Sequence, residues 1–305
     1  MKKRTITGLI MAAILIPLLT IPVLLETFQV VVIIGVIIAV FEMAKLFNSE
    51  KEKGFSFTFI LLLVTLLVYF ITAGFRLGTD EFDLSFSVGN NFTPIIMLVF
   101  LGVFIASIFI KNFKVNDIGK VFITAFFVGI GSASIVILRV MGVRFIVYLL
   151  LIASVTDIFA YIFGIKFGKH KMAPTISPKK SWEGAIAGAI IATIVAGSFG
   201  LFYGELFKGE LFNINNHNTI LAGISNLGSL SKVEQGFIIY PLAFFGSIVG
   251  QLGDLFASKL KRNYEAKDFG NIFPGHGGVL DRFDSAFFVA MFLVAIFILL
   301  SKILV

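Results

Sequence analysis

The sequence predicts an all-α, polytopic integral membrane protein with about nine transmembrane helices and a cytoplasmic N-terminus. Hydrophobic residues make up 58% of the 305 residues and charged residues only 14%, and the mean hydropathy is +0.99. Such a chain has too little polar surface to solvate a globule, so much of its apolar surface must face lipid. The apolar residues also occur in runs of about 20, the length that a helix needs to cross a bilayer.

The apolar runs define the predicted helices in order. The first follows a basic N-terminal stretch that resembles a signal peptide, but the run is too long and lacks a small-residue cleavage site, so we expect an uncleaved helix. Tight junctions at Glu26 and near Met141 predict that the first two spans, and the fifth and sixth, form helical hairpins. The nine predicted spans are residues 6–25, 29–47, 56–75, 92–110, 119–138, 145–163, 184–203, 236–257 and 286–304.

The distribution of basic residues predicts the orientation of these spans. With the N-terminus in the cytoplasm, the inside segments contain most of the Lys and Arg residues, as in 164–184 and 258–285. The longest outside loop, 204–235, contains only two basic residues, Lys208 and Lys232. This asymmetry is typical of a protein whose basic loops stay in the cytoplasm, and it supports an odd number of spans.

The chain is predicted to divide into two functional parts. Residues 1–140 contain almost purely apolar spans and are interpreted as an N-terminal membrane scaffold. Residues 141–305 are interpreted as a C-terminal catalytic membrane domain that presents two cytosolic loops, 164–184 and 258–285.

Composition excludes several classes of site. The chain has no cysteine, which rules out disulfides, thiolate catalysis and zinc–thiolate sites. The net charge of +7 is explained by cytoplasmic loops, and we expect no nucleic-acid partner. No P-loop or dinucleotide-binding glycine motif occurs, and three scattered histidines do not predict a metal site.

Acidic residues border or enter the membrane in the C-terminal part. Asp157 lies inside the sixth span and Asp254 near the cytosolic end of the eighth; an ionisable residue in a span usually has a partner or a function. Gly246, Gly250, Asp254 and Ser258 are spaced four apart, so they share one helical face, whose small residues allow another helix to approach closely. The alternative for Asp254 is a purely structural hydrogen bond to a neighbouring helix.

Asp281 and Asp284 open the ninth span and lie on one face of its first turn. Acids at this position are also favoured by the helix dipole, so a capping role is a direct alternative. A functional role is favoured because carboxylates from the eighth and ninth spans are expected at the same membrane face. Carboxylate oxygens are the ligands that Mg²⁺ prefers, so together they could bind this ion.

The segment "KDFGNIFPGHGGVLDRFDS", residues 267–285, combines these acids with cations and glycines. Glycines allow backbone N–H groups to approach an oxyanion closely. Carboxylates that could bind a metal ion lie beside basic residues that could bind phosphate. This combination predicts a phosphoryl- or nucleotidyl-transfer site at the cytosolic surface. His276 either contacts phosphate or is an ordinary loop residue. The surrounding cations are Lys259, Lys261, Arg262, Lys267 and Arg282.

The other cytosolic loop is expected to contribute to the same site. "ISPKKSWEG" places Ser177, Lys180 and Ser181 immediately before the seventh span, and Ser181 could cap its helix. The remaining lysines of this loop are explained equally well by attraction to anionic lipids. Gly184, Gly188 and Ala192 continue as a face for close helix packing.

Residues 258–284 resemble the signature of phosphatidate cytidylyltransferases, the CDP-diacylglycerol synthases, and "DIFAYIFGIKFGKHKMAPTISPKKSWEG" resembles a second conserved stretch of that family. No fixed position of the signature departs from the pattern. The matching positions are Ser258, Lys261, Arg262, Lys267, Asp268, Pro274, His276, Gly277, Gly278, Asp281, Arg282 and Asp284.

The resemblance implies the reaction of CTP with phosphatidic acid to give CDP-diacylglycerol and pyrophosphate. It also implies dependence on Mg²⁺, with a second monovalent or divalent cation as an option, a homodimer, and a multi-pass protein of the plasma membrane whose active site faces the cytoplasm. The candidate catalytic residues are Asp254, Asp281, Asp284 and Lys267, and the three aspartates are also the candidate metal ligands. The candidate substrate-binding residues are Ser177, Lys180, Ser181, Ser258, Lys261, Arg262, His276, Gly277, Gly278 and Arg282.

Two other functions remain as alternatives at this point. One is a different membrane transferase or kinase that uses CTP or a lipid phosphate. The other is a secondary transporter with Asp157 and Asp254 as coupling sites, although no internal repeat supports it.

Overall fold

The computed structural model describes residues 13–47, 55–73, 92–110, 113–207, 217–273 and 277–303. These residues are almost entirely helical, and the prediction of an all-α protein is confirmed. The two strands in this part of the chain form one short hairpin, β1 (Lys171–Ala173) and β2 (Ser177–Ser181).

The described residues form two compact units, and three helices contribute to both. The first unit comprises the chain up to Ile137 together with Leu260–Phe283, and the second comprises Leu138–Lys259 with Asp284–Val305. The first unit contains η1 (Pro22–Leu24), α2 (Leu25–Phe47), α3 (Phe55–Ala73), α5 (Phe92–Phe109), α6 (Val115–Thr124), a π-helical segment (Ala125–Ile130) and most of α7 (Gly131–Met141).

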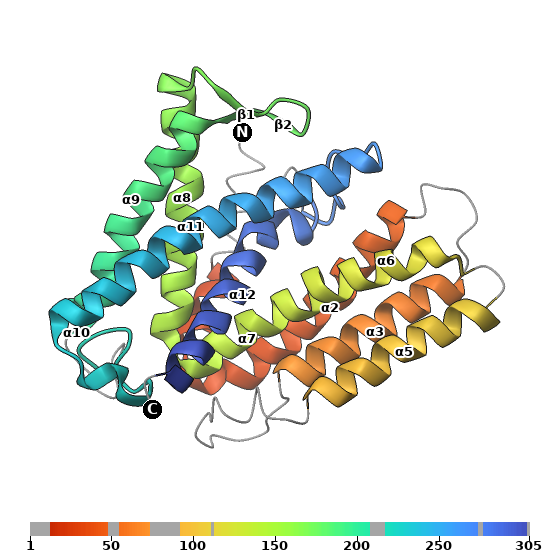
Figure 1. The fold of residues 1–305 in the computed structure, drawn as a ribbon, viewed down its shortest axis with the longest axis horizontal. Coiled ribbons are helices and arrows are strands. Elements are labelled where there is room, and N and C mark those ends of the chain that lie inside the picture. The colour runs from red at the N-terminus through yellow and green to blue at the C-terminus, as the bar shows by residue number, and fades with distance from the viewer. Residues whose placement is uncertain are drawn as a thin grey trace. The chain divides into compact units, whose positions relative to one another are not determined.

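In the first unit, α3 packs against α2, α5, α6 and the π-helical segment (Figure 1). Gly129 permits one close approach, since a Cβ there would lie 3.1 Å from the Thr65 carbonyl oxygen. The segment that follows Leu260 is anchored to α2 by aromatic packing. The rings of Phe47 and Tyr264 meet edge to face with centroids 5.2 Å apart, and Lys120 Nζ lies 5.6 and 5.7 Å from these two ring centroids.

In the second unit, α8 (Val143–Phe167) and α9 (Trp182–Leu201) form a closely packed pair. The predicted small-residue face explains this closeness. A Cβ on Gly188 would lie 2.7 Å from the Thr156 carbonyl oxygen, and one on Gly184 would lie 2.9 Å from the Cα of Gly164. The other elements of this unit are α10 (Tyr203–Leu206), η3 (Ser225–Ser229), α11 (Lys232–Asn263) and α12 (Leu280–Ile303), of which α11 and α12 continue into the first unit.

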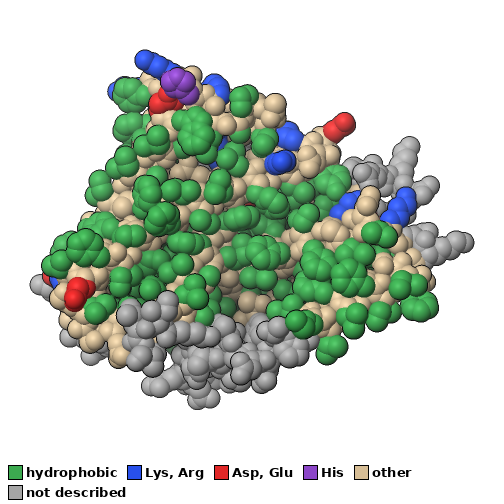
Figure 2. Space-filling model, viewed as in Figure 1, with side chains coloured by type: hydrophobic (Ala, Val, Ile, Leu, Met, Phe, Trp, Pro, Cys, Tyr) green, Lys and Arg blue, Asp and Glu red, His purple; other side chains and the backbone are tan. Residues whose placement is uncertain are grey.

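Seven helices of the described residues are long and apolar enough to cross a membrane. They correspond to seven of the nine predicted spans. The predicted fourth span is α5, whose apolar part Ile95–Phe109 is shorter. The predicted first span, 6–25, is described from residue 13, and residues 13–20 are helical. Hydrophobic side chains are spread over the face shown in Figure 2, and the few charged side chains visible there lie mainly near its edges. The total of nine, the orientation and the functional division at residue 140 stay predictions.

The two largest differences from the predicted boundaries have physical reasons. α11 extends to Asn263 instead of residue 257, because its last turns are polar and leave the apolar run on which the prediction depended. α12 begins at Leu280 instead of residue 286, because carboxylates satisfy the backbone N–H groups at its start, as described below.

Candidate active site

Asp281 is the centre of a buried charge cluster in the first unit. It lies in the first turn of α12, and its Oδ1 is 2.7 Å from Lys261 Nζ. Its Oδ2 accepts hydrogen bonds from the backbone N–H groups of Phe269 at 2.8 Å and Gly278 at 2.9 Å. The side chains of Lys261 and Asp281 are 11% and 5% exposed. Because desolvated charges are stable only when well partnered, this geometry fixes Asp281 firmly in place.

Asp281 is not the N-cap residue of α12, because the helix begins at Leu280 and the N–H groups of Val279 and Leu280 are bound by Glu42. Its carboxylate holds the backbone N–H of Gly278, which comes just before the helix. The other oxygen of this carboxylate accepts a hydrogen bond from the ammonium group of Lys261. One side chain therefore fixes the backbone just before α12 and also pairs with an ammonium group.

The remaining candidates of this segment differ in exposure. Lys267 and Arg282 are exposed, and exposed Arg262 donates to the Ala266 carbonyl oxygen at 3.2 Å. Gly277 has φ +84°, a conformation that favours glycine, and a Cβ there would lie 2.8 Å from Asp281 Oδ2. His276 lies outside the described residues, so its predicted phosphate contact stays a prediction.

Asp254 is the centre of a second charge cluster, in the second unit. Its Oδ2 lies 2.6 Å from Lys180 Nζ, and its Oδ1 accepts a 3.4 Å hydrogen bond from Ser258. The predicted helical face is thus confirmed for Asp254 and Ser258. The same face packs into the helix bundle, since a Cβ on Gly250 would lie 2.8 Å from Val289 Cγ2. Lys180 and Asp254 are 25% and 29% exposed, so this pair is more accessible than the first.

The β1–β2 hairpin brings Lys180 to Asp254. Sequence analysis predicted only a loop here, because two strands this short have no clear alternating pattern. Ser177 and Lys180 lie on β2, and Ser181 ends it and caps α9 by accepting the Gly184 N–H at 3.3 Å, as predicted. At the base of the hairpin, His170 Nδ1 lies 2.6 Å from Glu183 Oε1.

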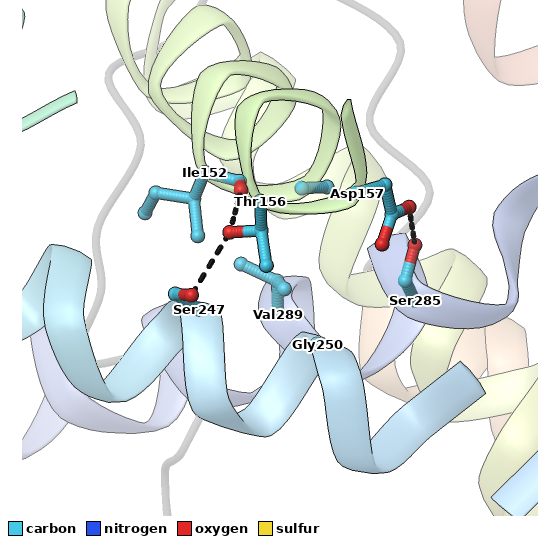
Figure 3. Close-up of a pocket in the computed structure, with 8 residues that line it drawn as sticks. Ile152, Thr156, Asp157, Ser247, Gly250, Ser285 and Val289 are labelled. Carbon is cyan, nitrogen blue, oxygen red and sulfur yellow. Dashed lines mark hydrogen bonds between the residues drawn. The ribbon is translucent and has the colours of Figure 1, made fainter. Parts of the chain in front are cut away.

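Asp157 lines a small pocket in the second unit, whose lining includes apolar side chains and three hydroxyl groups (Figure 3). Ser285 lies 3.5 Å from Asp157 Oδ2, and the hydroxyl groups of Thr156 and Ser247 are 2.9 Å apart. The charge of Asp157 also interacts with those of Asp254 and Lys180. Asp157 therefore has partners inside the bundle, although sequence analysis gave it a role only in the transporter alternative.

The structure does not bring all the predicted metal ligands into one described cluster. Among the described residues, no three His, Cys, Asp or Glu side chains form a group that could hold a metal ion. Asp254 and Asp281 belong to different units, and Asp284 Oδ1 accepts the N–H of Ser285 at 2.8 Å. The donor type nevertheless fits Mg²⁺, because carboxylate oxygens are the ligands it prefers. In this structure Lys180 pairs with Asp254, and Lys261 and two backbone N–H groups bind the two oxygens of Asp281.

Sequence analysis missed two buried acids, Asp117 in α6 and Glu42 in α2. Glu42 is 5% exposed and accepts hydrogen bonds from the backbone of Val279 and Leu280. The signal that could have found it is a single carboxylate within an otherwise apolar run, which is costly in a membrane unless it is partnered.

Comparison with known proteins identifies the family. The model of the cytidylyltransferase family matches residues 2–300. The chain belongs to the cytidylyltransferase family.

Individual relatives in this family match along nearly the whole chain. The chain is 31% identical over 290 residues to a phosphatidate cytidylyltransferase of Staphylococcus haemolyticus and 32% identical over 290 residues to one of Staphylococcus aureus strain COL. Each match covers 95% of this chain and 96% of the relative. Both charge clusters lie within the part of the chain that the family model matches.

Proposed function

We propose that this protein is a membrane-bound phosphatidate cytidylyltransferase, which transfers CMP from CTP to phosphatidic acid. The observation that carries the proposal is the similarity to proteins of that name over 95% of the chain. The helical, apolar architecture suits one lipid substrate and one water-soluble substrate, because the two can meet only at the membrane surface.

The reaction requires little acid–base chemistry from the protein. The phosphate of phosphatidic acid has a second pKa of about 6, by analogy with other phosphomonoesters, and is largely ionised near neutral pH. One of its oxygens forms a bond to the α-phosphorus of CTP, and the bond from that phosphorus to the bridging oxygen of the β-phosphate breaks. Pyrophosphate leaves, and the lipid retains the CMP group. Positioning and charge neutralisation are then the main requirements.

We assign Asp254, Asp281 and Asp284 as the ligands of Mg²⁺. The donor type supports this assignment, since all three are carboxylates, in the C-terminal part of α11 and the first turns of α12. When bound, the ion would neutralise charge on the phosphates and on the departing pyrophosphate. A second monovalent or divalent cation is part of the same proposal.

The cations of the chain would hold the phosphates. Lys180 and Lys261 each contact one of the candidate metal ligands, so each ammonium can neutralise phosphate beside the metal. Lys267 is an exposed cation, and we assign it the role of stabilising the negative charge that shifts toward pyrophosphate in the transition state. The other proposed substrate contacts are Ser177, Ser181, Ser258, Arg262, His276, Gly277, Gly278 and Arg282.

The proposal includes a cellular setting. Bacterial relatives and several apolar helices support a multi-pass protein of the plasma membrane. The basic loops 164–184 and 258–285 support an active site that faces the cytoplasm, where CTP is present. The homodimer rests on the family resemblance alone.

A direct assay tests this function. The purified protein in lipid nanodiscs receives CTP, phosphatidic acid and Mg²⁺, and we expect equal amounts of CDP-lipid and pyrophosphate. Omission of phosphatidic acid should abolish pyrophosphate release, and excess EDTA should abolish both products. If CTP is hydrolysed without a CDP-lipid, or is not consumed, the proposed function is wrong.

A further inference from the structure

We infer that Glu42, from the N-terminal half of the chain, is a positioning residue for Asp281 and therefore for the reaction. This inference rests on the proposed function of Asp281, and the contacts that support it all lie within the first unit.

Glu42 binds the start of α12 with both carboxylate oxygens. Its Oε1 accepts the N–H of Val279 at 2.9 Å, and its Oε2 accepts the N–H of Leu280 at 3.0 Å. These donors are among the N–H groups that a helix cannot satisfy by itself at its N-terminus. A negative charge there is also favoured by the helix dipole. Glu42 thus caps a helix that is 237 residues away in the sequence.

The two carboxylates divide consecutive donors between them. Gly278 donates its N–H to Asp281, and the next two N–H groups, of Val279 and Leu280, go to Glu42. A shift of this backbone would therefore move the hydrogen-bond donor that fixes Asp281 Oδ2. The position of Asp281 depends on Glu42 through three adjacent peptide groups.

Two glycines make room for the Glu42 carboxylate. A Cβ on Gly270 would lie 2.5 Å from Glu42 Oε1, and one on Gly278 would lie 2.5 Å from Glu42 Cδ. Real Cβ atoms do not approach this closely, so a side chain at either position would displace the carboxylate. The glycines of the signature segment therefore accommodate an anion of the protein itself, as well as any phosphate that binds nearby.

The chemistry explains why a glutamate is required. Both oxygens accept a hydrogen bond, whereas glutamine offers one oxygen and turns an NH₂ group toward the second N–H donor. The Glu42→Gln variant keeps the shape of the side chain but loses one bond and places two donors against each other. Aspartate would be one methylene too short to reach both donors from the same helix.

The main experiment compares Glu42→Gln with Glu26→Gln, the same chemical change at an exposed position of α2. We expect Glu42→Gln to lower kcat about 10- to 100-fold, as for a small misplacement of a reacting group. The KM for CTP should change little, because Glu42 does not touch substrate, and Glu26→Gln should match the wild type. A fall in activity that only follows the folded fraction, with kcat per folded molecule unchanged, would overturn the inference.

A double-mutant cycle distinguishes positioning from general damage. Gly270→Ala should lower kcat in the wild type by displacing the carboxylate, but should have little further effect once Glu42→Ala has removed it. Gly119→Ala in α6, where a Cβ would meet nothing within 4 Å, is the matched control. Full additivity of Gly270→Ala and Glu42→Ala would contradict a shared mechanism.

Hydrogen exchange gives a readout that does not depend on catalysis. In Glu42→Gln, peptides covering 268–273 and 277–280 should exchange about tenfold faster or more, because the opening of this segment costs less. Glu26→Gln should leave them unchanged. If the wild type makes no CDP-lipid, the proposed function fails, but unaltered exchange in Glu42→Gln is what would show that Glu42 does not position the segment.

Discussion

Asp254 and Asp281 are each paired with a lysine, but the two pairs differ in burial. Lys261 and Asp281 are 11% and 5% exposed, whereas Lys180 and Asp254 are 25% and 29% exposed. Removal of one partner from a buried pair leaves an uncompensated charge and costs about 3–5 kcal/mol. An exposed pair contributes only about 0–1 kcal/mol. The Lys180–Asp254 pair lies between these cases, because its side chains are partly exposed but Lys180 Nζ is buried. The same substitution should therefore have different effects on stability at the two sites.

Asp254→Asn is the cleaner test of the proposed metal ligands. We expect turnover to fall by a factor of about 100 or more, since a charge that stabilises the transition state is lost. The free energy of unfolding should fall by about 1–3 kcal/mol, because buried Lys180 Nζ loses its charged partner. Asp281→Asn should lose as much activity and also destabilise the protein by about 3–5 kcal/mol. Pyrophosphate release per folded molecule and thermal unfolding measure the two effects separately.

The control for these variants is Glu205→Gln, which changes an exposed acid paired with Lys232. It should alter neither turnover nor stability, because exposed pairs contribute little. Near-normal turnover of Asp254→Asn would remove that residue from the metal site. If Asp281→Asn is as stable as the wild type, other contacts must compensate for the loss of the buried Lys261–Asp281 pair.

Some residue-level features follow from local spacing, and others do not. Four residues make about one helical turn, so the contact of Ser258 with Asp254 could be predicted. The contacts of Lys180 with Asp254 and of Glu42 with Val279 join residues far apart in sequence. Such contacts depend on how helices pack, which a single sequence does not encode locally. Glu42 was overlooked for this reason.

At the scale of elements, the spans were predictable because a bilayer requires about 20 apolar residues. Their ends were less predictable, because polar extensions such as the last turns of α11 depend on contacts outside the membrane. The β1–β2 hairpin has no apolar periodicity to reveal it. It nevertheless determines where Lys180 lies, because β2 leads directly into α9.

Gly184→Ala tests whether the close packing of α8 and α9 holds this hairpin in place. The added methyl group would lie 2.9 Å from Gly164 Cα and closer still to the Ala160 carbonyl oxygen. Because backbone atoms cannot rotate away, we expect the helices to separate at a cost of about 1–3 kcal/mol. Thermal unfolding measures this cost, and turnover should also fall, since Lys180 would shift away from Asp254.

Gly102→Ala in α5 is the matched control, because a Cβ there would meet nothing within 4 Å. It should be neutral or slightly stabilising, since alanine has the higher helix propensity. Equal effects of the two substitutions would mean that Gly184 is replaceable and that α8 and α9 tolerate a wider separation.

At the scale of the whole molecule, the fold class followed from composition, whereas the division into units did not. Leu260–Phe283 belongs with the N-terminal helices, although the sequence places it among the residues predicted to be catalytic. Contacts of Glu42 and Phe47 with this segment account for the association. Long-range packing of this kind leaves no pattern in hydropathy, so apolar spans that resemble a scaffold can also contribute to a site.

The orientation of the whole chain is the last prediction, and its sequence makes the test simple. The protein contains no cysteine, so one introduced cysteine is the only thiol that a maleimide can label. Thr175, in the turn of the β1–β2 hairpin, and Ser229, at the end of η3, are both exposed. Their labelling therefore reports the side of the membrane and not burial.

In intact cells, a membrane-impermeant maleimide should label Ser229→Cys but not Thr175→Cys. In permeabilised cells both variants should be labelled, because the reagent then reaches the cytoplasmic face. The physical reason is the excess of lysines in 164–184 over those in 204–235, which keeps the hairpin inside. The opposite labelling would place the hairpin, with Lys180, outside the cell. CTP could not reach the site there, so this result would also contradict the proposed cytoplasmic chemistry.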